Sequence, residues 1–172
     1  MSWLFTYGDL MGQLLLRRYD AQPALLANYH RAFNHVSTLL WGTRDHPSPY
    51  LGLSPGGQCW GVAFRVSWLE RRSLLRRLEP QENAQEYRRI RAPIIVADGG
   101  TETALVWVSR PPHADGARWA DVTLTEAFMA AHGTTGRGVE YVRDLVHALG
   151  LWDISDPLIE EHWRRMESWR PR

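Results

Sequence analysis

The chain contains 172 residues, 44% of them hydrophobic and 23% charged, and this composition is typical of a globular protein. We expect a single domain over residues 1–172. The formal net charge of +1 argues against a nucleic-acid partner. All 20 basic residues are arginine, which excludes a P-loop lysine and a Schiff-base lysine. The single cysteine, Cys59, excludes an intrachain disulfide and a zinc site of several thiolates, and we expect it to be buried in a strand.

The distribution of apolar residues bears on membranes and location. The sequence has no apolar run of the roughly 18 residues that a membrane-spanning helix needs. Residues 1–7 lack the basic region and apolar core of a signal peptide. We therefore expect no membrane partner and a cytoplasmic location.

The first predicted element is a short buried strand over residues 2–7, which are mostly aromatic or apolar. Residues 8–12, Gly-Asp-Leu-Met-Gly, predict a tight turn with exposed backbone amides. Residues 24–41 fit both a helix and a strand, and the element type stays open here. Residues 42–49 contain two prolines and several polar residues, which predict a loop.

The middle of the chain predicts a hairpin followed by a helix. Strands are expected over residues 51–53 and 59–66, and Ser-Pro-Gly-Gly at 54–57 is typical of the turn between them. Residues 67–79 have the spacing of an amphipathic helix. Pro80 ends that pattern and begins a polar segment.

A second hairpin is predicted where residues 87–96 and 103–109 flank the turn signal Asp98-Gly99-Gly100. The rest of the chain is predicted to be helical. Helices are expected over residues 125–132, with Thr125 as N-cap and Gly133 as stop, over 139–149, and over 157–169 with Pro157 in the first turn. Strands early and helices late predict the α+β class.

Several motifs carry weaker signals. His30, His35, Asp45 and His46 have the residue types of a metal site, but nothing local supplies a convergent third ligand, so we expect hydrogen-bonding histidines and no metal. The glycine-rich residues 133–138 precede a helix without following a strand, which indicates a helix–helix connection rather than a phosphate cradle. The nine tryptophans show no repeat and are expected in the core or a pocket wall.

The sharpest chemical signal is three glutamates near Pro80: Glu79, Glu82 and Glu86. A carboxylate held in an apolar pocket has a raised pKa and can serve as general base and then as general acid. The alternative is three exposed glutamates beside the arginines of residues 71–77. The local sequence leaves both interpretations open.

Taken in order, four segments resemble the ChaC-type γ-glutamylcyclotransferases. Residues 3–11 resemble the strand and Tyr-Gly-Ser-Leu-Met loop of that family. The other matching segments are residues 29–33 with 41–44, residues 51–66, and residues 133–142. Each motif alone is weak, but four in the same order over most of the chain are specific.

The resemblance implies a small mixed β-barrel flanked by helices. It also implies the conversion of a γ-glutamyl peptide, typically glutathione, to 5-oxoproline and a released amine, typically Cys-Gly, without metal or cofactor. The substrate's own α-amino group would attack its γ-carbonyl, so the nucleophile is already tethered. One glutamate would carry the protons, and backbone amides of the turn Tyr7-Gly8-Asp9-Leu10 would bind anionic oxygen atoms.

In the related family the general base follows an arginine-rich helix end. It precedes, by about four to six positions, the tyrosine or other residue that opens the next strand. Glu82 lies five positions before Tyr87 and fits best, Glu79 is the reserve, and Glu86 fits worst. Tyr87 and Tyr141 are expected either in the wall of the substrate pocket or in ordinary barrel packing.

The sequence departs from the family at two positions. Asp9 stands where the family has serine, and Gly138 where it usually has asparagine. A carboxylate at position 9 would repel a substrate carboxylate unless it pairs with an arginine or with the substrate's ammonium. Two alternatives follow: a homologue that binds γ-glutamyl ligands without turnover, and a γ-glutamyl-amine cyclotransferase of a biosynthetic pathway.

Overall fold

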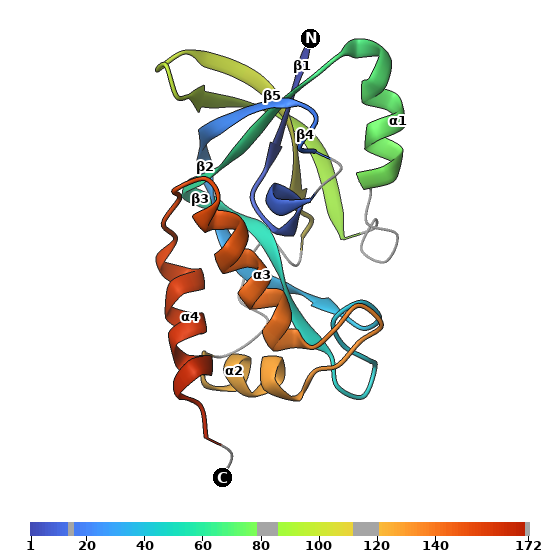
Figure 1. Cartoon of the computed structure of the whole chain (residues 1–172), viewed down its shortest axis with the longest axis vertical. Helices are drawn as coiled ribbons and strands as arrows, with labels where there is room; N and C mark the ends of the chain where they lie inside the picture. The colour runs from blue at the N-terminus through green and yellow to red at the C-terminus, as the bar shows by residue number, and fades with distance from the viewer. Residues whose placement is uncertain (14–15, 79–85, 112–120, 171–172) are drawn as a thin grey trace.

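The structure is a computed structural model that describes residues 1–13, 16–78, 86–111 and 121–170. In Figure 1 most of the strands lie in the upper part of the molecule and the helices of the C-terminal part of the chain lie in its lower part, with the two termini at opposite ends. The elements in chain order are β1 (Ser2–Thr6), the 3-10 helix η1 (Asp9–Gly12), β2 (Asp20–Ser37), β3 (Ser48–Val66), α1 (Trp68–Leu78), β4 (Tyr87–Val96), β5 (Thr101–Ser109), α2 (Asp121–Ala130), α3 (Gly138–Gly150) and α4 (Pro157–Ser168).

The strands form a closed barrel in the order β1-β3-β2-β4-β5. β1 closes the barrel by pairing parallel with β5, and the other pairs are antiparallel. In β4, Ala92, Ile94 and Val96 are buried and the residues between them exposed, as the alternation of side chains along a strand requires. The predicted α+β class and mixed barrel flanked by helices are confirmed.

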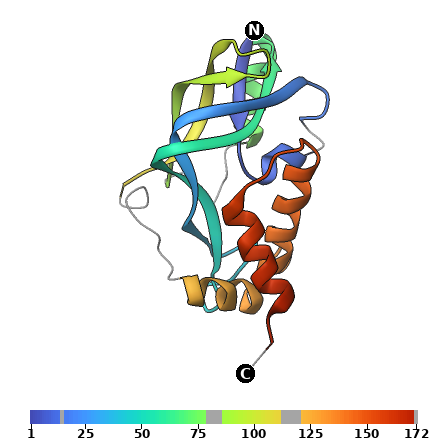
Figure 2. The same cartoon turned by 90° about the vertical axis from the view of Figure 1, so that its left-hand side faces the viewer.

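β2 and β3 are much longer than the rest of the barrel requires. They pair from Asp20 and Arg65 at one end to Ser37 and Ser48 at the other. Ala24–Leu26 of β2 also pair with β4, and residues 62–66 of β3 also pair with β1, so both of these stretches belong to the barrel. The rest of the ribbon, residues 27–37 of β2 with residues 48–58 of β3, leaves the barrel and reaches the helices (Figures 1 and 2). The segment 24–41, which fitted both element types, is therefore a strand as far as Ser37.

The hairpin predicted over residues 51–66 is wrong, because β3 runs through it as one strand. Pairing shifts from Ala27–Gln58 to Tyr29–Pro55, which leaves Gly56 and Gly57 in a β-bulge opposite Asn28. All three bulge residues have positive φ, at 89°, 69° and 65° respectively. The glycines that could reverse the chain instead absorb an extra residue, because β2 offers a partner on both sides of them.

The helices lie outside the barrel. α3 packs on η1 and α4, and it buries Val142, Leu145 and Leu149 at the three- and four-residue spacing of an amphipathic helix. α4 begins after Asp156, with Pro157 in its first turn as predicted. Thr125 is not the N-cap of its helix, because α2 already begins at Asp121. The glycine-rich residues 133–137 lie in the connection from α2 to α3, and Gly138 is the first residue of α3.

Within the described part of the chain, the helices are too short or too polar to cross a membrane.

Gly52 of β3 lies where the surrounding atoms leave no room for a side chain. A Cβ atom at this position would collide with Asn34 Oδ1, Ser109 Oγ and His35 Cδ2. We expect Gly52→Ala to lower the free energy of unfolding by about 2–3 kcal/mol, the range for overpacking a tight core. Gly150→Ala is the matched control, because its Cβ would meet open space and alanine favours a helix. Urea denaturation measures both, and equal stability of the two variants would contradict the prediction.

Candidate active site

A cavity of about 820 Å³ lies beside the turn that follows β1. Its walls come from segments far apart in the sequence. The lining residues are Phe5, Thr6, Tyr7, Gly8, Asp9, Leu10, Gln13, Leu39, Leu40, Tyr50, Leu51, Arg76, Arg77, Leu78, Tyr87, Trp107 and Tyr141.

The cavity brings together the residues that the sequence predicted to bind substrate. Four of them, Tyr7, Gly8, Asp9 and Leu10, form the turn that leads from β1 into the start of η1 (the β1–η1 turn). In this turn the Met11 N–H donates to the Gly8 carbonyl at 3.0 Å. Tyr87 enters the wall from the start of β4 and Tyr141 from the first turn of α3. Their shared position supports the predicted role, which stays a prediction.

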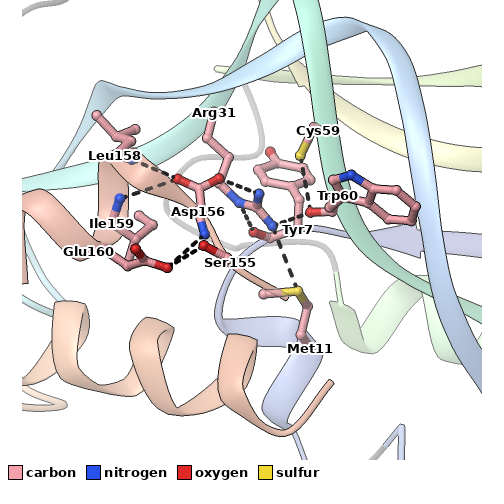
Figure 3. Close-up of polar contacts among 10 residues, drawn as sticks. All are labelled: Tyr7, Met11, Arg31, Cys59, Trp60, Ser155, Asp156, Leu158, Ile159 and Glu160. Carbon is pink, nitrogen blue, oxygen red and sulfur yellow. Dashed lines mark hydrogen bonds and ion pairs between the residues drawn. The ribbon is translucent and has the colours of Figure 1, made fainter. Parts of the chain in front are cut away.

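A buried arginine holds this turn in place (Figure 3). Arg31 Nε donates to the Tyr7 carbonyl at 2.7 Å, and Arg31 Nη2 donates to the Trp60 carbonyl at 2.5 Å. Arg31 Nη1 pairs with Asp156 Oδ2 at 2.6 Å, and the arginine side chain is only 2% exposed. The guanidinium therefore ties the turn, β3 and the start of α4 to one point in β2.

Asp156 serves two purposes in this network. Its Oδ2 atom pairs with Arg31, while its Oδ1 atom accepts hydrogen bonds from the backbone N–H groups of Leu158 and Ile159. The second role is that of an N-cap, which satisfies amides at the start of α4. One carboxylate thus fixes both the helix and the arginine that holds the turn.

Leu51 fixes the two tyrosines from the middle of β3. The Tyr87 hydroxyl donates to the Leu51 carbonyl at 2.7 Å, and the Leu51 N–H donates to the Tyr141 hydroxyl at 3.2 Å. Burial raises the pKa of both hydroxyls well above the usual range of tyrosine, so they stay protonated. The two residues therefore supply neutral, fixed walls.

Asp9 is an acidic residue of the cavity whose pKa is shifted by its surroundings. Burial raises the pKa of its carboxyl to about 6, and the charge of Asp144 adds to the increase. Hydrogen bonds from the backbone amides of Asp9 and Leu10 stabilise the carboxylate and oppose that increase. The amides that the sequence assigned to a substrate anion thus already interact with this side chain.

Of the three glutamates singled out, Glu79 and Glu82 lie outside the described residues. Glu86 turns to His35, whose Nδ1 lies 2.9 Å from Glu86 Oε2. His35 Nε2 lies 2.7 Å from Ser109 Oγ, and its ring lies 4.2 Å from the ring of Tyr87. Glu86 and His35 therefore anchor the start of β4, and Glu86 does not line the cavity.

The other candidate ligands have ordinary roles. His30 Nδ1 lies 3.0 Å from the Gly56 carbonyl. Among the residues described, no three histidine, cysteine or acidic side chains gather as a metal site would require. Cys59 is buried in β3, as expected, and burial raises the pKa of its thiol to about 11.

Among the polar residues of the cavity that sequence reasoning missed are Gln13, Tyr50, Arg76 and Arg77. The two arginines were predicted to lie on a helix, beside glutamates exposed to solvent in one interpretation, and not in the wall of a cavity. Tyr50 stacks on Tyr141 with ring centroids 4.9 Å apart, a contact between β3 and α3 that no local pattern indicates.

Comparison with known proteins identifies the family. A family model described as ChaC-like protein matches residues 2–167. The chain therefore belongs to the ChaC-like protein family, and the resemblance seen in the sequence is confirmed.

A relative from Escherichia coli (strain K12) is described as a glutathione-specific gamma-glutamylcyclotransferase. It is 28% identical over 149 residues, which are 86% of this chain and 64% of the relative. The chain thus spans slightly less than two thirds of the length of that relative.

Solved structures share the fold. A crystal structure of a γ-glutamyl cyclotransferase specific to glutathione from yeast superposes with a TM-score of 0.85 at 16% identity, over 98% of this chain and 96% of the other. A second yeast structure gives 0.78 at 16% identity over 99% of both chains. A structure described as gamma-glutamyl cyclotransferase gives 0.54 at 15% identity, over 99% of this chain and 89% of the other. At these identities the likeness establishes the barrel fold alone.

We expect removal of either partner of the Arg31–Asp156 ion pair to lower the stability of the protein strongly. Arg31→Met leaves the carboxylate and two carbonyls without their donor, and Asp156→Asn keeps the N-cap but leaves a buried cation. We expect each change to lower the free energy of unfolding by about 3 kcal/mol, and the double variant to lose less than the sum.

Chemical denaturation tests this prediction, with Arg143→Gln as the control. Arg143 pairs with Asp144 in an exposed contact at 3.4 Å, so its removal should change stability by at most about 0.5 kcal/mol. Additive losses in the Arg31 and Asp156 variants would show that the two residues act independently.

Asp9 predicts a dependence of stability on pH. Its folded-state pKa is raised from 3.8 to about 6, so its contribution to stability is complete below about pH 4 and is lost as the pH rises through 6. We expect Asp9→Asn to raise the free energy of unfolding by up to about 2 kcal/mol at pH 7.5 and by only a few tenths at pH 4. Urea denaturation at both pH values measures the gain, and an equal gain at both would rule out titration of Asp9 as its source.

Proposed function

We propose that this protein is a γ-glutamylcyclotransferase that converts glutathione, or a related γ-glutamyl peptide, to 5-oxoproline and Cys-Gly. The observation that carries the proposal is the cavity, which unites the β1–η1 turn with Tyr87 and Tyr141 in a chain of the ChaC-like family. The name of the Escherichia coli relative supports glutathione as the first substrate to test.

The chemistry needs little beyond positioning. The α-amine of the substrate attacks its own γ-carbonyl, a C–N bond closes the five-membered ring, and the bond to the leaving amine breaks. The α-amine loses a proton and the leaving nitrogen gains one, so a single carboxylate can serve both steps. The reaction proceeds without metal or cofactor, because the nucleophile and the electrophile belong to the same molecule.

The residues around the cavity have distinct parts in this reaction. Backbone amides of the turn Tyr7-Gly8-Asp9-Leu10 bind anionic oxygen atoms of the substrate. Tyr87 and Tyr141, fixed on Leu51, form walls that hold the γ-glutamyl arm folded for attack.

Glu82 is the proposed general base and acid, with Glu79 in reserve. Leu78 and Tyr87, which precede and follow these glutamates in the sequence, both line the cavity. Glu79 follows Leu78 directly, and Glu82 lies four residues after Leu78 and five before Tyr87. Glu86 is less suited to this role, since it pairs with His35.

One observation favours a second candidate, a homologue that binds γ-glutamyl ligands without turnover. The Asp9 carboxylate interacts with the amides of Asp9 and Leu10, two of the groups that the reaction assigns to the substrate. A γ-glutamyl-amine cyclotransferase remains the third interpretation, and it differs in the leaving group alone.

The single domain and the cytoplasmic location stay predictions from the sequence.

The decisive experiment is the release of 5-oxoproline, measured by mass spectrometry, from glutathione and from a panel of γ-glutamyl dipeptides and amines. We expect release from glutathione, and a loss of about 100-fold or more in Glu82→Gln, as for removal of a general base. Glu167→Gln, an exposed glutamate of α4, is the control and should retain full activity.

Each other outcome has a definite meaning. Loss in Glu79→Gln alone would keep the reaction and move the base to Glu79. Release from γ-glutamyl amines but not from glutathione would favour the biosynthetic enzyme. No release from any compound, with ligand still raising the melting temperature, would favour the binding protein.

A further inference from the structure

The cavity has a pronounced separation of charge. Asp9 is the one acidic side chain among its described lining residues, and it lies on the β1–η1 turn. Arg76 and Arg77 line the same cavity from the last turn of α1. Within the described residues, neither arginine forms an ion pair with Asp9 or with any other carboxylate. One wall therefore presents a negative charge and another wall two positive charges.

The surroundings of Asp9 suit a cation. The Tyr87 hydroxyl donates to the Leu51 carbonyl and the Tyr141 hydroxyl accepts from the Leu51 N–H, so Leu51 fixes both aromatic rings in the cavity wall. Asp9 lines the same cavity as these rings. A partly desolvated carboxylate and aromatic side chains in one cavity can together bind an ammonium group, through charge and through the negative faces of the rings. Asp9 forms no ion pair with another described residue, and burial raises the pKa of its carboxyl.

The charges of Arg76, Arg77 and Asp9 favour one orientation of a γ-glutamyl peptide in the cavity. A γ-glutamyl peptide carries one ammonium group, on its γ-glutamyl end, and carboxylates on both ends. Carboxylates are repelled by Asp9 and attracted by guanidinium groups. The ammonium group is the one charged part of such a molecule that the Asp9 wall favours.

We propose that Asp9 is a specificity-determining residue that binds the α-ammonium group of the γ-glutamyl ligand. This inference rests on the proposed function for the ligand class, but it concerns binding and not turnover. It gives position 9 a role in recognition that serine, the residue of the related family motif, lacks the charge to perform. The ammonium held there must still lose a proton before attack, so Asp9 strengthens binding more than it accelerates the reaction.

The test compares two ligands that differ only in the ammonium group: glutathione and glutaryl-Cys-Gly, which has hydrogen in its place and cannot cyclise. The melting temperature of the protein is measured over a range of ligand concentrations to obtain Kd. We expect the unmodified protein to bind glutathione about tenfold or more tightly, as for a partly buried charge pair. In Asp9→Asn and Asp9→Ser this preference should fall to about twofold or less, through weaker binding of glutathione.

The matched control is Asp144→Asn, which removes a neighbouring charge from an exposed residue outside the cavity lining and should keep the preference. A preference that survives in both Asp9 variants would overturn the inference. So would tighter binding of glutathione in Asp9→Ser, or a failure of the unmodified protein to favour glutathione.

Release of 5-oxoproline, measured on the same preparations, separates this inference from the proposed function. Preference for glutathione that depends on Asp9, without any release, would keep the inference and reject the cyclotransferase. Release with an unchanged KM in Asp9→Asn would keep the cyclotransferase and reject the inference. A higher KM with kcat unchanged or raised supports both, and a merely structural role of Asp9 would not produce that split.

Discussion

The buried Arg31 guanidinium is the contact on which the rest of the site depends. A charge in the interior is tolerated only when its partners are in place, and Arg31 finds them in Asp156 and in the carbonyls of Tyr7 and Trp60. These partners belong to α4, to the β1–η1 turn and to β3. The electrostatic requirement of one side chain therefore sets the position of the turn that carries Asp9, and it links the turn to a helix start more than a hundred residues later in the chain.

A second set of contacts fixes the opposite side of the cavity. Leu51 holds Tyr87 and Tyr141 by its backbone, while His35 contacts both Glu86 and the ring of Tyr87. Both anchors lie on the β2–β3 ribbon, beyond the stretches that pair with β1 and β4. The unusual length of these strands thus has a direct use: it carries the groups that position the cavity wall beyond the barrel itself.

Local patterns were sufficient where the local sequence decides the structure. The strand at residues 2–7 and the helix with Val142, Leu145 and Leu149 have patterns that few other structures satisfy. The hairpin failed because Gly56 and Gly57 suit a reversal and a bulge equally well, and only the distant partner Asn28 distinguishes them. Arg76, Arg77 and Tyr50 were missed for the same reason, since the cavity exists only once α1, β3 and α3 meet.

Asp9 connects stability to recognition. An ionised carboxylate in a partly buried wall opposes folding, so this position weakens the empty protein at neutral pH. A ligand that brings an ammonium group removes that cost on binding, because the charge then has a partner. Part of the binding free energy therefore comes from removing the unfavourable desolvation of the unpaired Asp9 carboxylate. The same carboxylate would repel a ligand that offers only carboxylates to this wall, so the strain that lowers stability also discriminates between ligands.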